Sequence, residues 1–96
     1  MITAYTPEEI QTQLIEHFKM LAKYWAELPD KTPKDRCDGL AFSILNIFDG
    51  TTAVLPAFDI VAKPHPDDKD FNIKNGERYY EDGTVVNNCY LHDLYY

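Results

Sequence analysis

The densest cluster of side chains that could do chemistry lies in the segment KPHPDDKDF, residues 63–71. It brings together one imidazole and three carboxylates, those of His65, Asp67, Asp68 and Asp70. With His92 or Asp93 arriving from the C-terminal end, these groups could ligate a metal ion, but their spacing matches neither an EF-hand loop nor an HExxH motif. Helix capping is the simpler explanation, because Pro66 suits a first helical position and acids stabilise a first turn. We therefore predict a short helix that ends at Asn75, and no metal ion.

The histidines and cysteines give no support for an enzyme. His65 and Asp67 could form a general acid–base pair, but neither a nucleophile motif nor a glycine-rich phosphate loop accompanies them. Cys37 and Cys89 form no CxxC motif and no Cys/His cluster with zinc spacing. We expect two reduced, buried thiols; a disulfide or a reactive thiol is the alternative. No catalytic residue and no cofactor is predicted.

Length, charge and hydropathy indicate the number of domains and the kinds of partner that this chain could have. The 96 residues suit one domain, residues 1–96, with a radius of gyration of about 12–13 Å. A net charge of −7, spread along the chain, argues against direct nucleic-acid binding, which needs a basic surface. No apolar run approaches the ~20 residues that span a bilayer, and the first residues do not resemble a secretory signal. The sequence predicts a soluble, cytoplasmic protein.

Two long helices should carry the fold. Thr6-Pro7-Glu8-Glu9 combines a capping threonine, a proline at the first helical position and a capping-box glutamate. Apolar residues then recur at helical spacing within an arc of about 80°. The first helix is predicted from Pro7 to Leu28.

The second helix should be the central element of the chain. Thr32-Pro33 repeats the start signal and Gly50 is a natural stop, which predicts a helix from Pro33 to Asp49. Its apolar residues, concentrated in the run from Leu40 to Phe48, cover an arc of about 160°, so this helix should pack on more than one side.

The remaining side of this second helix is the candidate interaction surface. It carries an aromatic ring among acidic and polar side chains, and the C-terminal tyrosines are grouped with it: Asp35, Asp38, Phe42, Asn46, Asp49, Tyr95 and Tyr96. Gly39 lies beside this surface, and the close approach of another backbone would offset its low helix propensity. Two interpretations stay open for Phe42. Either the C-terminal third folds over the ring, or the ring is an exposed anchor for a partner protein.

The C-terminal third is harder to predict. Phe58–Ala62 is the best strand candidate, with Arg78–Tyr80 as its antiparallel partner. Val85–Tyr96 fits a short helix, although a strand is the alternative. The predicted fold class is therefore α+β and mostly helical: two long N-terminal helices packed as a hairpin, a small two-stranded ribbon and one or two short C-terminal helices.

The chain also resembles a known family. The segments RCDGLAFSILNIFDG, LPAFDIV with PHPDDKDF, and NNCYLHDLYY are similar to those of a family of small uncharacterised proteins that bacteriophages and prophages carry. The resemblance covers the chain from about Thr6 onward. It implies a bacterial cytoplasm and a role in phage–host conflict or phage regulation, and it transfers no catalytic or binding residue, because the family has no assigned activity.

Three classes of function follow from these features. The first is a protein–protein interaction module with an unknown protein partner, of which a homodimer is one form. The second is a DNA-mimicking inhibitor of a host nucleic-acid-binding or defence protein, consistent with the negative charge. A small metal-dependent enzyme ranks last, because no motif supports it.

Overall fold

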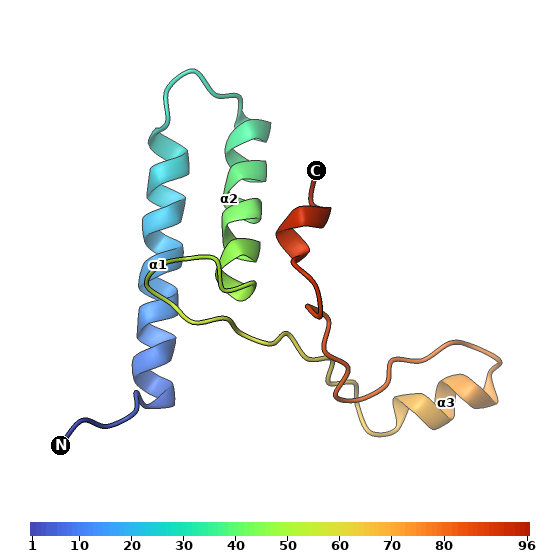
Figure 1. Cartoon of the computed structure of the whole chain (residues 1–96). Helices are drawn as coiled ribbons and strands as arrows, with labels where there is room; N and C mark the ends of the chain where they lie inside the picture. The colour runs from blue at the N-terminus through green and yellow to red at the C-terminus, as the bar shows by residue number, and fades with distance from the viewer.

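The fold is built on a hairpin of two helices. The computed structural model describes residues 1–96, and Figure 1 shows α1 (Pro7–Glu27) and α2 (Pro33–Phe48) lying side by side. Two short elements follow: α3 (Asp68–Lys74) and a 3₁₀ helix, η1 (Leu91–Leu94). The chain is all-helical and has no sheet, so the predicted α+β class is wrong.

Local signals place both long helices. At the start of α1, Thr6 Oγ1 accepts from the Glu9 N–H at 3.2 Å while the Glu9 carboxylate accepts from the Thr6 N–H at 2.9 Å. Thr32 and Asp35 make the same reciprocal pair at the start of α2. Each pair satisfies two N–H groups that the first turn of a helix leaves without partners. The helices begin where the sequence predicts and end one residue earlier than expected.

The two helices meet through aromatic and small side chains. The Trp25 ring lies directly over Gly39, where an added Cβ would overlap the ring. The close neighbour of Gly39 is therefore an aromatic side chain and not the backbone that the sequence suggested. Phe48 contacts Phe18 edge to face at 6.3 Å between ring centroids, and Ile47 is fully buried.

A two-stranded ribbon does not form. Val61 and Val85 make one isolated antiparallel bridge, flanked by hydrogen bonds from the Ala62 N–H to the Thr84 carbonyl and from the Val86 N–H to the Ile60 carbonyl. The pairing stops there because Pro64 has no N–H on one side, and because the Asn87 side chain binds the Ile60 N–H on the other, at 2.8 Å. The predicted partner strand, residues 78–80, is exposed and forms no β-bridge with residues 58–62.

Other expectations for the C-terminal third also need correction. Helical structure within the predicted segment 85–96 is limited to η1, because the Asp49 carboxylate takes the His92 N–H and ties the segment to α2. The helix near residue 70 does form, and Asn75 follows it as predicted. Cys37 and Cys89 are free but exposed, and thus not buried.

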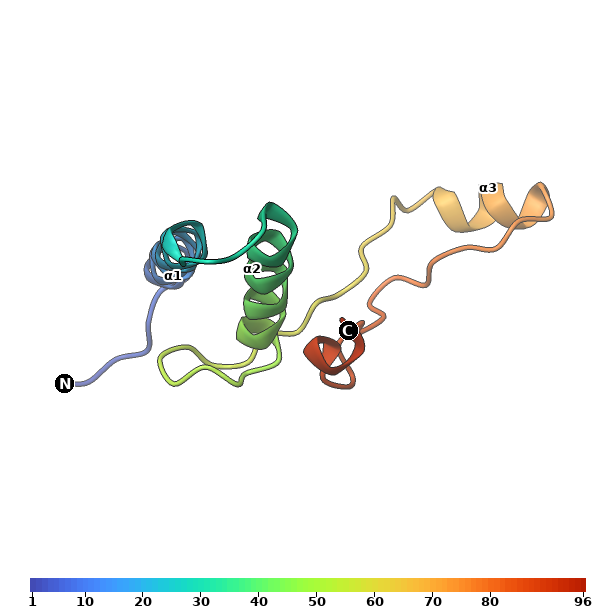
Figure 2. The same ribbon diagram turned by 90° about the horizontal axis from the view of Figure 1, so that it is seen from above.

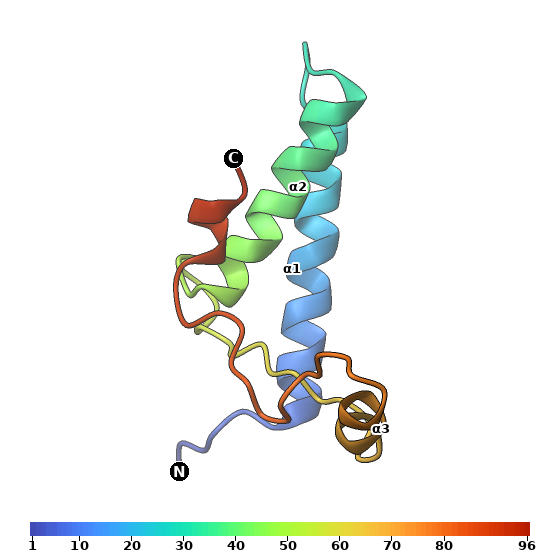
Figure 3. The same cartoon turned by 90° about the vertical axis from the view of Figure 1, so that its right-hand side faces the viewer.

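The molecule is flat and open. Its radius of gyration is 17.6 Å and its extents are 52 × 48 × 20 Å, whereas a compact chain of this length would have a radius near 12–13 Å. Residues 59–86, which we call the arm, run away from the hairpin and carry α3 at their far end (Figures 1 and 2). Seen from the side in Figure 3, η1 lies against α2, whereas Figures 1 and 2 show α3 well away from both long helices. No helix in the chain has the length and apolar character needed to cross a bilayer.

Candidate interaction surface

The C-terminal residues fold onto Phe42. Its ring lies edge-on to His92 at 5.6 Å, tilted against Tyr96 at 5.4 Å and 6.4 Å from Tyr95, measured between ring centroids. We call these four side chains the aromatic cluster. Phe42 is half-buried beneath it, while Tyr96 keeps 81% of its surface exposed. The ring of Phe42 is therefore the base of the cluster, and the tyrosines form its outer surface.

A buried carboxylate holds this C-terminal segment in place. Asp49 is the C-cap residue that directly follows α2, and its side chain is fully buried. One carboxylate oxygen, Oδ2, accepts from the His92 N–H at 2.8 Å and lies 2.6 Å from Nδ1 of the His92 ring. Burial of the carboxylate is the largest single effect and opposes its ionisation. The interactions with His92 and the hydrogen bond from the Leu91 backbone together outweigh burial, so the pKa of Asp49 lies below its ordinary value.

A second carboxylate fixes Tyr95. Asp38 accepts from Lys34 at 2.6 Å, one helical turn earlier, and from the Tyr95 hydroxyl at 2.8 Å. The hydrogen bond from Lys34, followed by that from Tyr95, lowers the pKa of Asp38, and the bond to Asp38 raises the pKa of Tyr95. Asp38 thereby orients the outer rim of the aromatic cluster.

The structure gathers most, but not all, of the predicted surface. Asp38, Phe42, Asp49, Tyr95 and Tyr96 lie together, as just described. Asp35 is exposed, and its carboxylate accepts from the Thr32 N–H in the N-terminal cap of α2. Asn46 turns back along the helix to donate to the Phe42 carbonyl at 2.9 Å, and it accepts from Thr51 at 2.6 Å.

A groove of about 470 Å³ opens beside the aromatic cluster. Phe42 and Tyr96 form one wall, and residues of α1, including His17 and Trp25, form the other. The indole N–H of Trp25 donates to Ser43 Oγ at 3.0 Å and so joins the two helices across the groove. Thr52 Oγ1, also in the lining, is buried without a hydrogen-bond partner. The groove combines aromatic walls with single polar groups, which suits a docked side chain or short peptide segment.

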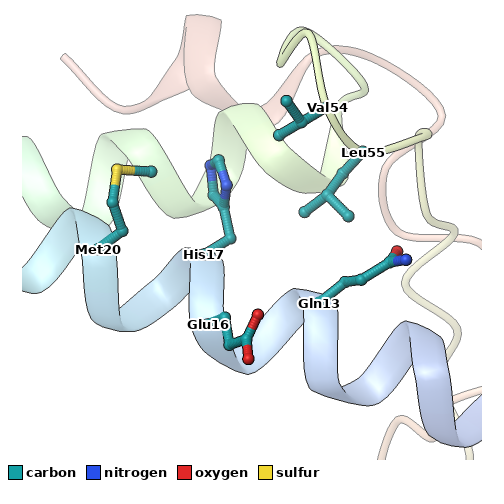
Figure 4. Close-up of a pocket in the computed structure, with 6 residues that line it drawn as sticks. All are labelled: Gln13, Glu16, His17, Met20, Val54 and Leu55. Carbon is teal, nitrogen blue, oxygen red and sulfur yellow. The ribbon is translucent and has the colours of Figure 1, made fainter.

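A second hollow lies where the loop after α2 crosses α1 (Figure 4). Its volume is about 310 Å³ and its lining mixes polar α1 side chains, His17 among them, with Val54 and Leu55 of the loop. Leu55 is 7% exposed and Val54 is 72% exposed. The buried Leu55 side chain therefore holds the loop against α1, whereas the Val54 side chain lies at the side of the hollow that is open to solvent.

The residues predicted as a metal site or an acid–base pair near His65 form only a local turn. His65 Nδ1 accepts from the Asp67 N–H at 3.1 Å, which is a local turn, and lies 3.8 Å from the Asp67 carboxylate. No group of three or more His, Cys, Asp or Glu side chains lies close enough together to hold a metal ion.

Sequence reasoning missed two residues that build this site. His92 was considered only as a metal ligand, but its backbone and ring both bind Asp49. Asn87 binds three backbone groups on two segments: the Ile60 N–H and the Phe58 carbonyl at 2.6 Å, and the Phe48 carbonyl at the end of α2 at 3.4 Å. Asp49 is an acid at the C-terminal end of a predicted helix, where the helix dipole disfavours it, and this is the sequence signal for a compensating partner such as His92. No sequence signal identifies Asn87.

Comparison with known proteins adds no assignment. No family model matches the chain, and neither the curated proteins nor the solved structures gave a match. The structure is an all-helical chain with an aromatic and acidic surface, and this surface is the main indication of function.

Proposed function

We propose that this chain is a protein–protein interaction module that binds its partner through the aromatic cluster and the adjoining groove. The observation that carries the proposal is Tyr96, which packs on Phe42 yet keeps 81% of its surface exposed. Tyrosine supplies a large, rigid contact area with a polar tip, and it is enriched where proteins bind one another.

Pre-organisation favours this surface further. Asp38 holds the Tyr95 hydroxyl, and Asp49 holds His92, so two of the aromatic rings are oriented before a partner arrives. Ordering the side chains in advance lowers the entropic cost of binding. The Asp38 carboxylate at the rim is already paired with Lys34 at 2.6 Å, so the contact offered to a partner is mainly the aromatic surface.

In the cluster His92 is paired with the Asp49 carboxylate, but no hydroxyl or thiol nucleophile is hydrogen-bonded to the His92 ring. The groove offers no nucleophile paired with a base and no metal-binding group of side chains. These contacts support the proposal of a binding protein, and no cofactor is part of that proposal. In line with the resemblance noted from the sequence, we place it, also as a proposal, in the cytoplasm of a bacterium that carries a phage or prophage.

The test is an affinity pull-down from bacterial lysate with three baits. The wild-type chain and Tyr5→Ala should enrich the same protein, whereas Tyr96→Ala should lose it. Tyr5 is a matched control because it is 66% exposed and lies before α1, away from the cluster. Equal capture by all three baits would refute the assignment of this surface.

Salt dependence distinguishes the DNA-mimicking alternative. A mimic relies on carboxylates, so its partner should dissociate as ionic strength rises from about 0.05 to 0.5 M. Binding centred on Tyr96 and Phe42 buries apolar surface and should change little over that range. Steep loss of binding with salt would favour the inhibitor class.

A further inference from the structure

The isolated chain leaves an unusually large surface in water. Its accessible area is 7715 Å², whereas a compact protein of 11.1 kDa exposes about 5,700 Å². The excess is therefore about 2,000 Å². Only 4 of 96 residues are buried, and Ile47 and Leu55 are the only large side chains among them.

The arm accounts for part of this excess. α3 has seven residues and contacts no other helix. Phe71 and Ile73 stand on opposite sides of α3 and are 64% and 53% exposed. A helix this short is marginal in water without packing, so α3 needs a covering surface that its own chain does not supply.

The helical hairpin carries an apolar groove that could cover the exposed apolar side chains of α3. α1 and α2 enclose about 310 Å³ lined mainly by apolar groups, among them Ala22, Ala26 and Leu40, with Trp25 at its edge. We call this the hairpin groove. No residue of the arm or of η1 lines it, and it shares only Trp25 with the groove beside the aromatic cluster.

We propose that the covering partner is a second copy of this chain, with α3 of each copy packed in the hairpin groove of the other. One chain carries both halves of this contact, an arm with projecting apolar side chains and an apolar groove, which is what a reciprocal two-fold interface requires. The excess sums to about 4,000 Å² for two chains, which is the upper limit for this contact and lies within the range of obligate homodimers. The 20 Å thickness of the molecule suits this arrangement, since two such flat molecules stack into a compact particle.

The first test is the mass of the purified full-length chain in solution, measured by sedimentation equilibrium. At about 10 µM we expect twice the 11.1 kDa of the chain. Phe71→Ser should raise the dimer dissociation constant by about 100-fold or more, because each dimer loses two buried rings worth tenfold or more each. Val54→Ser, at an exposed apolar residue outside both contact surfaces, should leave the dimer unchanged. A monomeric wild-type chain would overturn the proposal, and so would a Phe71→Ser chain as dimeric as the wild type.

The second test locates the contact. Cys37 lines the hairpin groove and is exposed. In a Cys89→Ser background, Lys74→Cys, one turn after Phe71 on the same side of α3, should form a disulfide-linked dimer with Cys37 of the second copy under mild oxidation. Adding Cys37→Ser should abolish this product. A dimer by mass without this cross-link would refute the arm-to-groove packing. Neither result depends on the aromatic cluster, so the lysate experiment and these experiments can fail separately.

Discussion

Replacing Asp49 should release the C-terminal segment and leave the helical hairpin intact. Asp49 is the only side chain that joins α2 to η1 through both the backbone and the ring of His92. It sits at the C-terminus of α2, where the helix dipole disfavours a negative charge. The carboxylate is therefore retained for its hydrogen bonds and not for helix stability.

The magnitude follows from these contacts. Hydrogen bonds to a charged group contribute about 1.5–3 kcal/mol each, and relief of the unfavourable dipole returns about 0.3–1 kcal/mol. Because two bonds to one oxygen are not additive, Asp49→Ala should weaken docking by about 2–3 kcal/mol. Asp49→Asn keeps an oxygen that accepts from the His92 N–H, so it should lose only about 1 kcal/mol.

Amide hydrogen exchange at His92 measures this directly. A loss of 2–3 kcal/mol corresponds to exchange about 30- to 150-fold faster in Asp49→Ala than in the wild type. Amides in the middle of α1 should exchange as before. Unchanged protection at His92, or equal effects of the alanine and asparagine variants, would refute the role given to the carboxylate.

Further predictions concern the packing, the arm, the helix cap and the pH response. Gly39→Ala should destabilise the fold by about 1–3 kcal/mol in thermal unfolding, because its Cβ would overlap Trp25; in a Trp25→Ala background the same change should instead stabilise by up to about 1 kcal/mol. Asn87→Ala should cost about 2 kcal/mol and speed exchange of the amides that hold the arm. Thr32→Ala should cost about 1 kcal/mol through loss of the cap. Since the pKa of Asp49 is lowered on folding, its contribution is complete above its ordinary pKa near 4 and is lost as pH falls through the lower folded value. His92 protection should therefore weaken in acid, and Asp49→Ala should lack that dependence.

Matched variants control these tests. Asn88→Ala, next to Asn87 but exposed, should leave the arm unchanged. Thr12→Ala lies inside α1 and should not destabilise, since alanine favours a helix interior. If Gly39→Ala had the same sign in both backgrounds, the contact with Trp25 would not explain the glycine.

The predictable part of this chain is the part where local signals decide structure. Thr6 and Thr32, each followed by proline and a carboxylate, specify both helix starts through contacts within four residues. Their apolar stripes then favour a hairpin. The aromatic ring of Phe42 among acidic side chains could also be identified from spacing alone, before any knowledge of what covers it.

The wrong predictions arose where a single long-range side chain overrides the backbone pattern. Alternation in residues 58–62 indicated a strand, but the Asn87 carboxamide occupies the hydrogen-bonding positions that a ladder would use. The segment 85–96 showed helical spacing, but Asp49 ties it to α2 at His92 and only a short 3₁₀ turn forms. Both interactions join residues that are far apart in the sequence, so no local period reveals them.

The expectation of a compact domain failed for another reason. The apolar content of the chain is ordinary, which predicted a compact fold with Cys37 buried. In this structure Cys37 is exposed, and so are Phe71 and Ile73. Apolar content alone does not distinguish a core from a surface that is covered by another molecule.

The most direct test of the proposed function is a hydrogen-exchange footprint of this chain with the protein that it captures from lysate. We predict new protection on residues 38–46 of α2 and on residues 91–96, the two segments that form the aromatic cluster and line its groove. Protection confined to other segments, with residues 91–96 exchanging as in the free chain, would contradict the account.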